Sequence, residues 1–224
     1  MSYYIDLENI SIDDYKEILK SADLLPSRMI LKDNIDGVFA VIQKQKIENV
    51  DELYNALKTK NKLQEFSKQS GIQENYLKIL IREVNSYRPR PNKLSDFPGT
   101  SENVFLALES LGIKNTCQLF EHILTPQKRS ELSEQTGVDK AEIERLARLT
   151  DLSRIRWVNH TFAYVLLEAG YDSARNVANA NYKNLYEEVK KLNEERQIYK
   201  GHIGLHDMKL CIEAARDVPL DIAF

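Results

Sequence analysis

Apolar residues recur at helical spacing along most of the chain. One such stripe, Val104, Leu108 and Leu111, ends at Gly112, and a glycine just past an apolar stripe is typical of a helix C-terminus. Alternating strand patterns are nearly absent, and Tyr3–Ile5 is at most one short extended piece. The pattern therefore predicts an all-α protein.

The strongest feature of the pattern is an internal repeat. A shift of 66 residues aligns 47–84 with 113–150 without a gap, and eleven of the 38 pairs are identical. Composition alone gives roughly two or three identities over such a stretch. A shift of 58 residues places Gly112-Ile113 on Gly170-Tyr171, which indicates a partial third copy.

The copies carry the same signals for helix ends. Asn49 and Asn115 are each followed three residues later by Glu or Gln, the spacing of a capping box. Thr125-Pro126 has the residue types preferred at the N-cap and at the first helical position. Each copy is therefore expected to follow the same path of short helices.

The repeat divides the chain into five segments. We expect an N-terminal helical segment over 1–25, repeat one over 26–87, a Pro/Arg linker over 88–93, repeat two over 94–151, and repeat three with a C-terminal helix over 152–224. Prolines one residue apart in the linker cannot continue a helix.

Composition narrows the class of protein. Lys and Arg number 31 and Asp and Glu 34, a net charge of −3, and 42% of the residues are hydrophobic, which is typical of a soluble globular protein. No apolar run approaches the roughly 20 residues of a membrane span, and the N-terminus lacks the features of a signal peptide. Two distant cysteines, Cys117 and Cys211, form no disulfide framework. We expect a cytoplasmic protein without a membrane partner.

A turn in repeat two carries a family resemblance. The segment Leu94–Ser101, which contains Pro98, Gly99, Thr100 and Ser101, precedes a helix that ends in Leu111-Gly112-Ile113, and this order is similar to a helix-hairpin-helix unit. The segment Ile155–His160 looks like a second example. The tandem pattern resembles a bacterial family known only as domain of unknown function 4332, over most of 94–217 and, through the duplication, over 26–87. The resemblance implies about three tandem helix-hairpin-helix (SAM-like) units.

In helix-hairpin-helix proteins, the backbone N–H groups of the hairpin hold a nucleic-acid phosphate without reading sequence. The two glycine positions of that motif are held here by Asp33 and Ile35, by Gly99 and Ser101, and by Trp157 and Asn159. Of the replacements, only Asn159 readily tolerates a positive φ. Glu102 and Asp36 follow the first two hairpins, and a carboxylate there repels a phosphate.

The third hairpin is the best candidate for phosphate binding. Its candidate residues are Arg145, Arg148, Arg154, Arg156, Asn159 and His160. They predict weak, sequence-nonspecific and salt-dependent binding of a DNA or RNA backbone. The alternative is that these arginines form a solvated face and pair with acids such as Glu142, Glu144 and Asp151. The basic linker, with Arg88, Arg90 and Lys93, is open to the same two interpretations.

A protein-interaction or scaffold module without nucleic-acid binding is the alternative function. It is favoured by the acidic net charge and by the acids at the first two hairpins. Trp157 at a glycine position is explained either by core packing or by an exposed contact. The sequence leaves the oligomeric state and the identity of the partner open.

An enzyme is the weakest interpretation. The sequence contains no Gly-rich phosphate loop and no recognisable catalytic triad, so we expect a non-enzymatic protein without a cofactor. His202 and His206 have a metal-ligand spacing, but Gly204 lies between them and no third ligand is evident. We therefore expect no metal.

Overall fold

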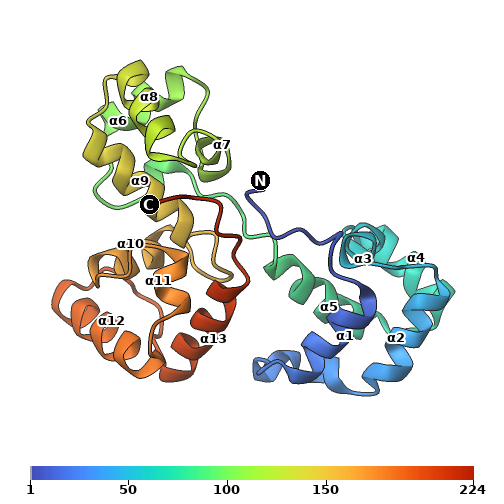
Figure 1. The fold of residues 1–224 in the computed structure, drawn as a ribbon. Helices are drawn as coiled ribbons and strands as arrows, with labels where there is room; N and C mark the ends of the chain where they lie inside the picture. Colours follow the sequence, from blue (N-terminus) through green and yellow to red (C-terminus); the bar gives the residue numbers. More distant parts are fainter. Residues whose placement is uncertain (1) are drawn as a thin grey trace. The chain divides into compact units, whose positions relative to one another are not determined.

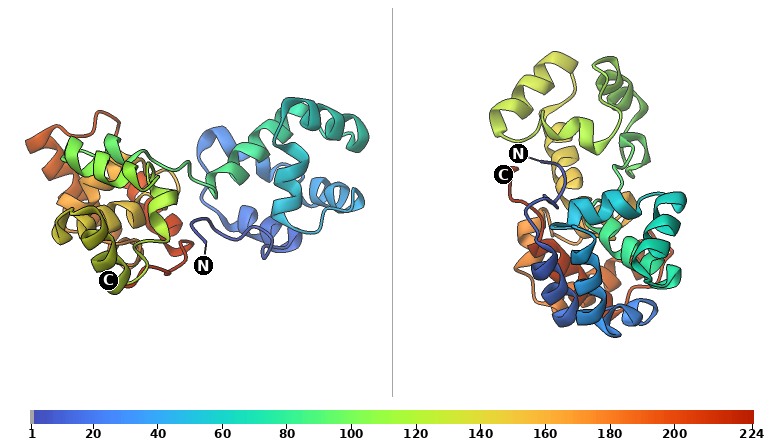
Figure 2. Two further views of the ribbon diagram at one scale, coloured as in Figure 1. Left: turned by 90° about the horizontal axis from the view of Figure 1, so that it is seen from above. Right: turned by 90° about the vertical axis from the view of Figure 1, so that its right-hand side faces the viewer.

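A computed structural model describes residues 2–224. Over these residues the chain forms α-helices, short 3₁₀ segments and two isolated β-bridges, with no β-strand. Figures 1 and 2 show these helices joined by short connections. The predicted all-α fold is confirmed.

The chain forms two compact units. The small unit is Asp6–Arg88, and the large unit combines residues 2–5 with Pro89–Phe224. The chain therefore leaves the large unit after Ile5 and returns to it at Pro89. The helix expected near Ser11 belongs to the small unit, because it packs against the second helix of that unit.

The helices of each unit are as follows. The small unit contains α1 (Ile12–Ser21), η1 (Pro26–Lys32), α2 (Ile35–Lys44), α3 (Val50–Leu57), α4 (Lys60–Ser70) and α5 (Glu74–Ser86). The large unit contains η2 (Leu94–Asp96), α6 (Glu102–Ser110), α7 (Thr116–Phe120), α8 (Pro126–Thr136), α9 (Lys140–Leu152), α10 (His160–Glu168), α11 (Ala174–Ala178), α12 (Tyr182–Arg196) and α13 (Leu205–Arg216).

Helices of the two units coincide under the 66-residue shift. The starts of α3, α4 and α5 fall on the starts of α7, α8 and α9. The caps coincide as well: the side chains of Asn49 and Asn115 each accept a hydrogen bond from the backbone N–H three residues on. Gly71 and Gly137 end α4 and α8 with φ values of 74° and 69°. Identical residues at these positions therefore produce the same local structure.

The two β-bridges extend this correspondence toward the N-terminus. Ser11 pairs with Asn49 in the small unit, and Lys93 pairs with Asn115 in the large unit. The N–H of Val50 donates to Ile10 O (3.0 Å), as the N–H of Thr116 donates to Asn92 O (2.9 Å). The shared path therefore begins near Ile10 in the small unit, before α1.

The equivalent helices α5 and α9 are packed against different elements in the two units. α5 contacts α3, α4 and η1, whereas α9 contacts α7, α8 and α10. η1 thus covers α5 as α10 covers α9. The guanidinium of Arg28, on η1, pairs there with the buried carboxylate of Glu83. The element that covers this helix is therefore η1 in the small unit and α10, the first helix of repeat three, in the large unit.

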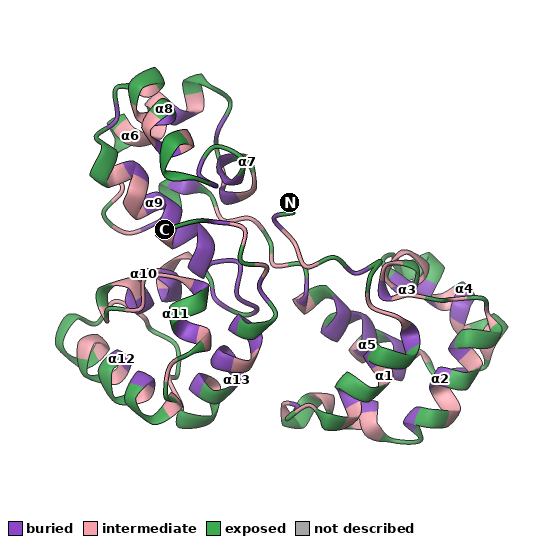
Figure 3. Ribbon diagram, viewed as in Figure 1, coloured by how far each residue is buried: buried purple, intermediate pink, exposed green. Residues whose placement is uncertain are grey.

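The 58-residue shift also holds for helix bounds. α6 and α7 fall on α10 and α11. Gly112 follows α6 and Gly170 follows α10, and both glycines have a positive φ (79° and 93°). α9 extends from the group α6–α8 to the group α10–α13 (Figure 1). Its C-terminal end is buried (Figure 3), and the turn that follows joins the two groups.

Candidate interaction site at the third hairpin

The turn between α9 and α10 has the backbone path of the turn before α6. In the earlier turn Gly99 has a φ of 80°, and in the later one Trp157 has a φ of 68°. The N–H of Thr100 donates to Phe97 O, and that of Val158 donates to Ile155 O. A tryptophan therefore occupies a left-handed conformation that glycine adopts in the equivalent turn. Asn159, the residue expected to tolerate a positive φ, has a φ of −89°.

This conformation is unfavourable for a residue with a large side chain. The left-handed region costs a non-glycine residue roughly 1–2 kcal/mol. Only part of the Trp157 surface is buried in return, because the residue remains 45% exposed. The Arg156 guanidinium lies 4.9 Å from the indole centroid. The indole is thus an exposed contact and not part of the core.

The first N–H of α10 is bonded within the chain. The N–H of His160 donates to Asn92 Oδ1 (3.1 Å), and that of Phe162 donates to Asn159 Oδ1 (2.9 Å). Asn92 is itself fixed, because its N–H donates to the Thr116 hydroxyl (3.0 Å). The helix end that was expected to hold a phosphate is therefore covered by an amide from the linker.

Arg154 lies in the core, with a side chain 1% exposed. Its Nε donates to Tyr3 O (3.1 Å), and its terminal nitrogens donate to Pro219 O (3.0 Å) and to Asp151 Oδ1 (3.1 Å). The guanidinium also lies 4.7 Å from the Phe120 ring centroid. The guanidinium thus donates hydrogen bonds to two segments that are far apart in the sequence, around Tyr3 and around Pro219.

Asp151 neutralises this buried cation. Its second oxygen accepts a hydrogen bond from the N–H of Ala174 (2.8 Å), at the first residue of α11. The corresponding N–H groups of α3 and α7 bond to a backbone carbonyl instead. Burial raises the pKa of the Asp151 carboxyl and lowers the pKa of Arg154, because both charged groups have lost their water.

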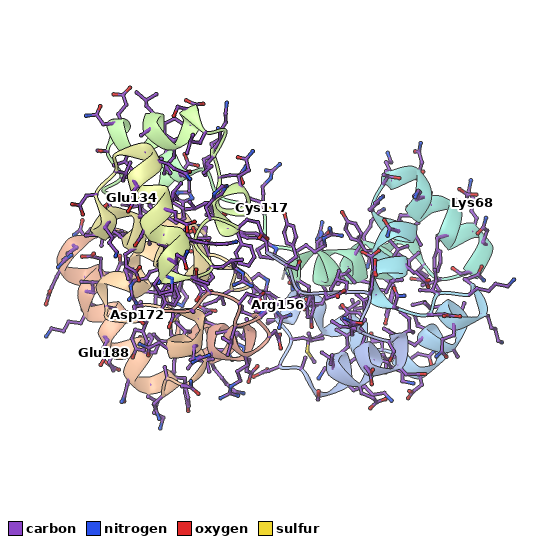
Figure 4. All side chains as sticks on the ribbon, turned by 45° about the horizontal axis from the view of Figure 1, so that its top comes forward. Lys68, Cys117, Glu134, Arg156, Asp172 and Glu188 are labelled. Carbon is purple, nitrogen blue, oxygen red and sulfur yellow. The ribbon has the colours of Figure 1, made fainter. Side chains whose placement is uncertain are left out.

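Arg156 lies in the turn itself, where Figure 4 labels it. Its guanidinium donates to Asp217 Oδ2 (2.9 Å), at the residue after α13. Burial raises the pKa of the Asp217 carboxyl, and the neighbouring Arg156 opposes this effect. Arg156 is therefore a structural tie between the turn and the end of the last helix.

The arginines of α9 also have partners within the unit. Arg145 donates to Glu142 Oε1 (2.8 Å) and to Pro98 O, which ties α9 to the second hairpin. Arg148 pairs with Glu144 (3.2 Å) and with Asp172. The four candidate arginines thus face four different sets of partners, and the structure does not bring them together beside Asn159. Three of their partners, Glu142, Glu144 and Asp151, are the acids expected to pair with them, but the pair of Arg154 with Asp151 is buried and does not form part of a solvated face.

A comparison with protein families adds one result. The model of the family described as Domain of unknown function (DUF4332) matches residues 98–218. The chain belongs to this family. No curated protein and no solved structure matches the chain.

The DUF4332 region contains the strained Trp157 and all four candidate arginines. Two residues that hold the third hairpin in place, Tyr3 and Asn92, lie outside the matched residues. Sequence reasoning did not find their roles, because each acts on a residue more than 60 positions away and neither carries a charge. The only local signal was the basic linker around Asn92.

The remaining candidates of the DUF4332 chain form no recognisable chemical site. Among residues 2–224, no group of three or more His, Cys, Asp and Glu residues is arranged to hold a metal ion. Asp207, beside His206, accepts a hydrogen bond from the N–H of Gly204 (2.9 Å) and so caps α13. No helix in the described part of the chain has the length and apolar character needed to cross a bilayer.

Proposed function

We propose that this protein is a non-enzymatic protein-interaction module and that a partner docks at the third hairpin. The observation that carries the proposal is Trp157, which is 45% exposed and held at a φ of 68°. Backbone strain of this kind often occurs at functional sites, where the surrounding structure maintains it. Tryptophan and arginine side chains are also the residues most enriched among energetically dominant interface contacts.

The surroundings of the turn favour a protein partner over a phosphate backbone. A helix end holds a phosphate through free N–H groups and adjacent cations. At the third hairpin the N–H of His160 is bonded to Asn92, and Arg154 and Arg156 are bonded to Asp151 and Asp217. These internal contacts would have to break before a phosphate could use the same groups. Binding of a DNA or RNA backbone is therefore the less favoured proposal.

Titration with nucleic acid tests this choice. Purified protein is mixed with labelled oligodeoxythymidine and with single-stranded RNA at about 50 mM salt, where electrostatic binding is strong. We expect no change in the anisotropy of either oligonucleotide. Binding that weakens steeply between about 50 and about 200 mM salt would contradict the proposal and restore the phosphate site.

Affinity capture then tests the docking surface. Tagged wild-type protein and the Trp157→Gly variant are used to recover partners from the same lysate. We expect the variant, which keeps the backbone conformation of the turn, to lose partners that the wild type retains. Identical sets of partners would show that Trp157 is not the anchor. Arg175→Ala is a matched control, because Arg175 is exposed on α11.

A further inference from the structure

We infer that the partner presents an acidic segment, which places an apolar side chain on Trp157 and its carboxylates on Lys93 and Arg90. This inference rests on the proposed function, since it names the chemistry of the protein that docks at the third hairpin.

The structure brings the linker cations to the hairpin. The hydrogen bond from the N–H of His160 to Asn92 Oδ1 attaches the linker to the start of α10. His160 is three residues after Trp157 in the chain. Lys93 is the next residue after Asn92, and its backbone is held by the bridge to Asn115. Arg90 lies two residues before Asn92. Arg90, Lys93 and Trp157 thus lie within three residues along the chain of one or other end of this hydrogen bond, and we call these three residues the linker–hairpin surface.

The linker cations are available, unlike those of the hairpin. Lys93 and Arg90 are both exposed, and neither forms an ion pair with any of residues 2–224. Arg154 and Arg156, by contrast, are each neutralised by an aspartate. The positive charge that a partner meets here thus comes from the linker, which contains no acidic residue between Arg88 and Lys93. Opposite charges across an interface accelerate association and select the partner.

Trp157 supplies the apolar part of the surface. Its backbone is fixed by the turn, in which the N–H of Val158 donates to Ile155 O. The Arg156 guanidinium, 4.9 Å from the indole centroid, is held in turn by Asp217 (2.9 Å). A pre-organised aromatic anchor reduces the entropic cost of association.

The number of free cations favours an acidic peptide over a nucleic acid. Affinity for a phosphate backbone grows with the number of phosphates that are neutralised by Lys and Arg side chains. The linker–hairpin surface offers two unpaired cations on a chain with a net charge of −3. Two cations beside an indole match a short segment in which carboxylates flank a leucine or a similar residue.

The fluorescence of Trp157 provides a direct test, because it is the only tryptophan in the chain. The full-length protein is titrated with a short peptide of glutamate and leucine that contains no aromatic residue. Two parallel titrations use the same peptide with glutamine in place of glutamate, and oligodeoxythymidine. We expect the acidic peptide to shift the tryptophan emission to shorter wavelength in a saturable manner. The neutral peptide should bind at least about tenfold more weakly than the acidic peptide.

Charge reversal identifies the cations involved. In Arg90→Glu/Lys93→Glu we expect affinity for the acidic peptide to fall by about tenfold or more. The matched control, Arg175→Glu/Lys191→Glu, makes the same change in net charge at exposed positions on α11 and α12 and should bind as the wild type does.

Each other outcome overturns the inference. Equal binding of the neutral and acidic peptides would remove the charge selection but leave protein docking at Trp157 in place. Tighter binding of oligodeoxythymidine than of the acidic peptide would overturn both the inference and the proposed function. No spectral change with any probe, or equal loss in both charge-reversal variants, would show that the linker–hairpin surface does not bind acidic segments.

Discussion

The side-chain oxygen of Asn92 accepts a hydrogen bond from the backbone N–H of His160 at 3.1 Å. This contact spans 68 residues and attaches the linker to the start of α10. It occupies the helix end at which a helix-hairpin-helix protein would hold a phosphate, and it fixes the linker that carries Arg90 and Lys93 at the start of α10.

Replacement of Asn92 tests how much this contact stabilises the fold. In Asn92→Ala we expect the free energy of unfolding to fall by about 0.5–1.5 kcal/mol, since a partly buried N–H loses its acceptor. Amide hydrogen exchange at His160 should become faster, whereas exchange at Phe162, which is capped by Asn159, should change less. Unchanged exchange at His160 would contradict the role of Asn92.

Both equivalent turns should be more stable with glycine than with alanine. Trp157→Gly should be more stable than Trp157→Ala by about 1 kcal/mol, because both variants lose the indole and only glycine adopts positive φ without a steric penalty. Gly99→Ala should destabilise it by about 1–2 kcal/mol, because a side chain is strained at a φ of 80° and its Cβ would lie 3.0 Å from Arg145. Urea unfolding measures both differences, and opposite preferences at the two positions would argue against the equivalence of the turns.

Arg154 should be essential for stability of the large unit. Its removal in Arg154→Met leaves the carboxylate of Asp151 and the carbonyls of Tyr3 and Pro219 without their donor. We expect a loss of about 3–5 kcal/mol in the free energy of unfolding. The exposed Arg175 is the matched control, and Arg175→Met should stay within about 0.5 kcal/mol of the wild type. Similar unfolding of both variants would mean that the buried network contributes little.

The pair formed by Arg156 and Asp217 should make stability depend on pH. Burial raises the pKa of Asp217, so the native state takes up a proton at higher pH than the unfolded chain does. Protonation of this group therefore adds stability as the pH falls through its native pKa. This contribution is complete below the unfolded value of about 3.9. Relative to Asp217→Asn, the wild type should gain stability as the pH falls from 7 towards about 3.9 in urea unfolding, and parallel curves for the two proteins would contradict the shift.

Local features of the fold could be predicted from the sequence. Helix starts at Asn115 and Thr125 and the helix end at Gly137 depend on residues within one turn, and the repeat shows them twice. The all-α class follows from the same signals. Three tandem helix-hairpin-helix units remain a prediction, although helix bounds and caps coincide between copies.

The partners of the candidate arginines could be predicted only in part. Pairs such as Arg145 with Glu142 lie within one helix turn and are visible in the sequence. The burial of Arg154 depends on Tyr3 and Pro219, which are 151 and 65 residues away. The positive φ of Trp157 opposes the preference of its residue type, so the surrounding turn determines it.

The guanidinium of Arg154 joins a carbonyl of residue 3 to a carbonyl of residue 219. During synthesis residue 219 leaves the ribosome long after residue 3, and the small unit that lies between them in the chain, Asp6–Arg88, is complete before residue 219 is added. The carbonyl of Tyr3 must therefore wait for that of Pro219 before this part of the core can close, so the small unit can fold as the chain grows whereas the large unit closes this contact only after Pro219 has been added.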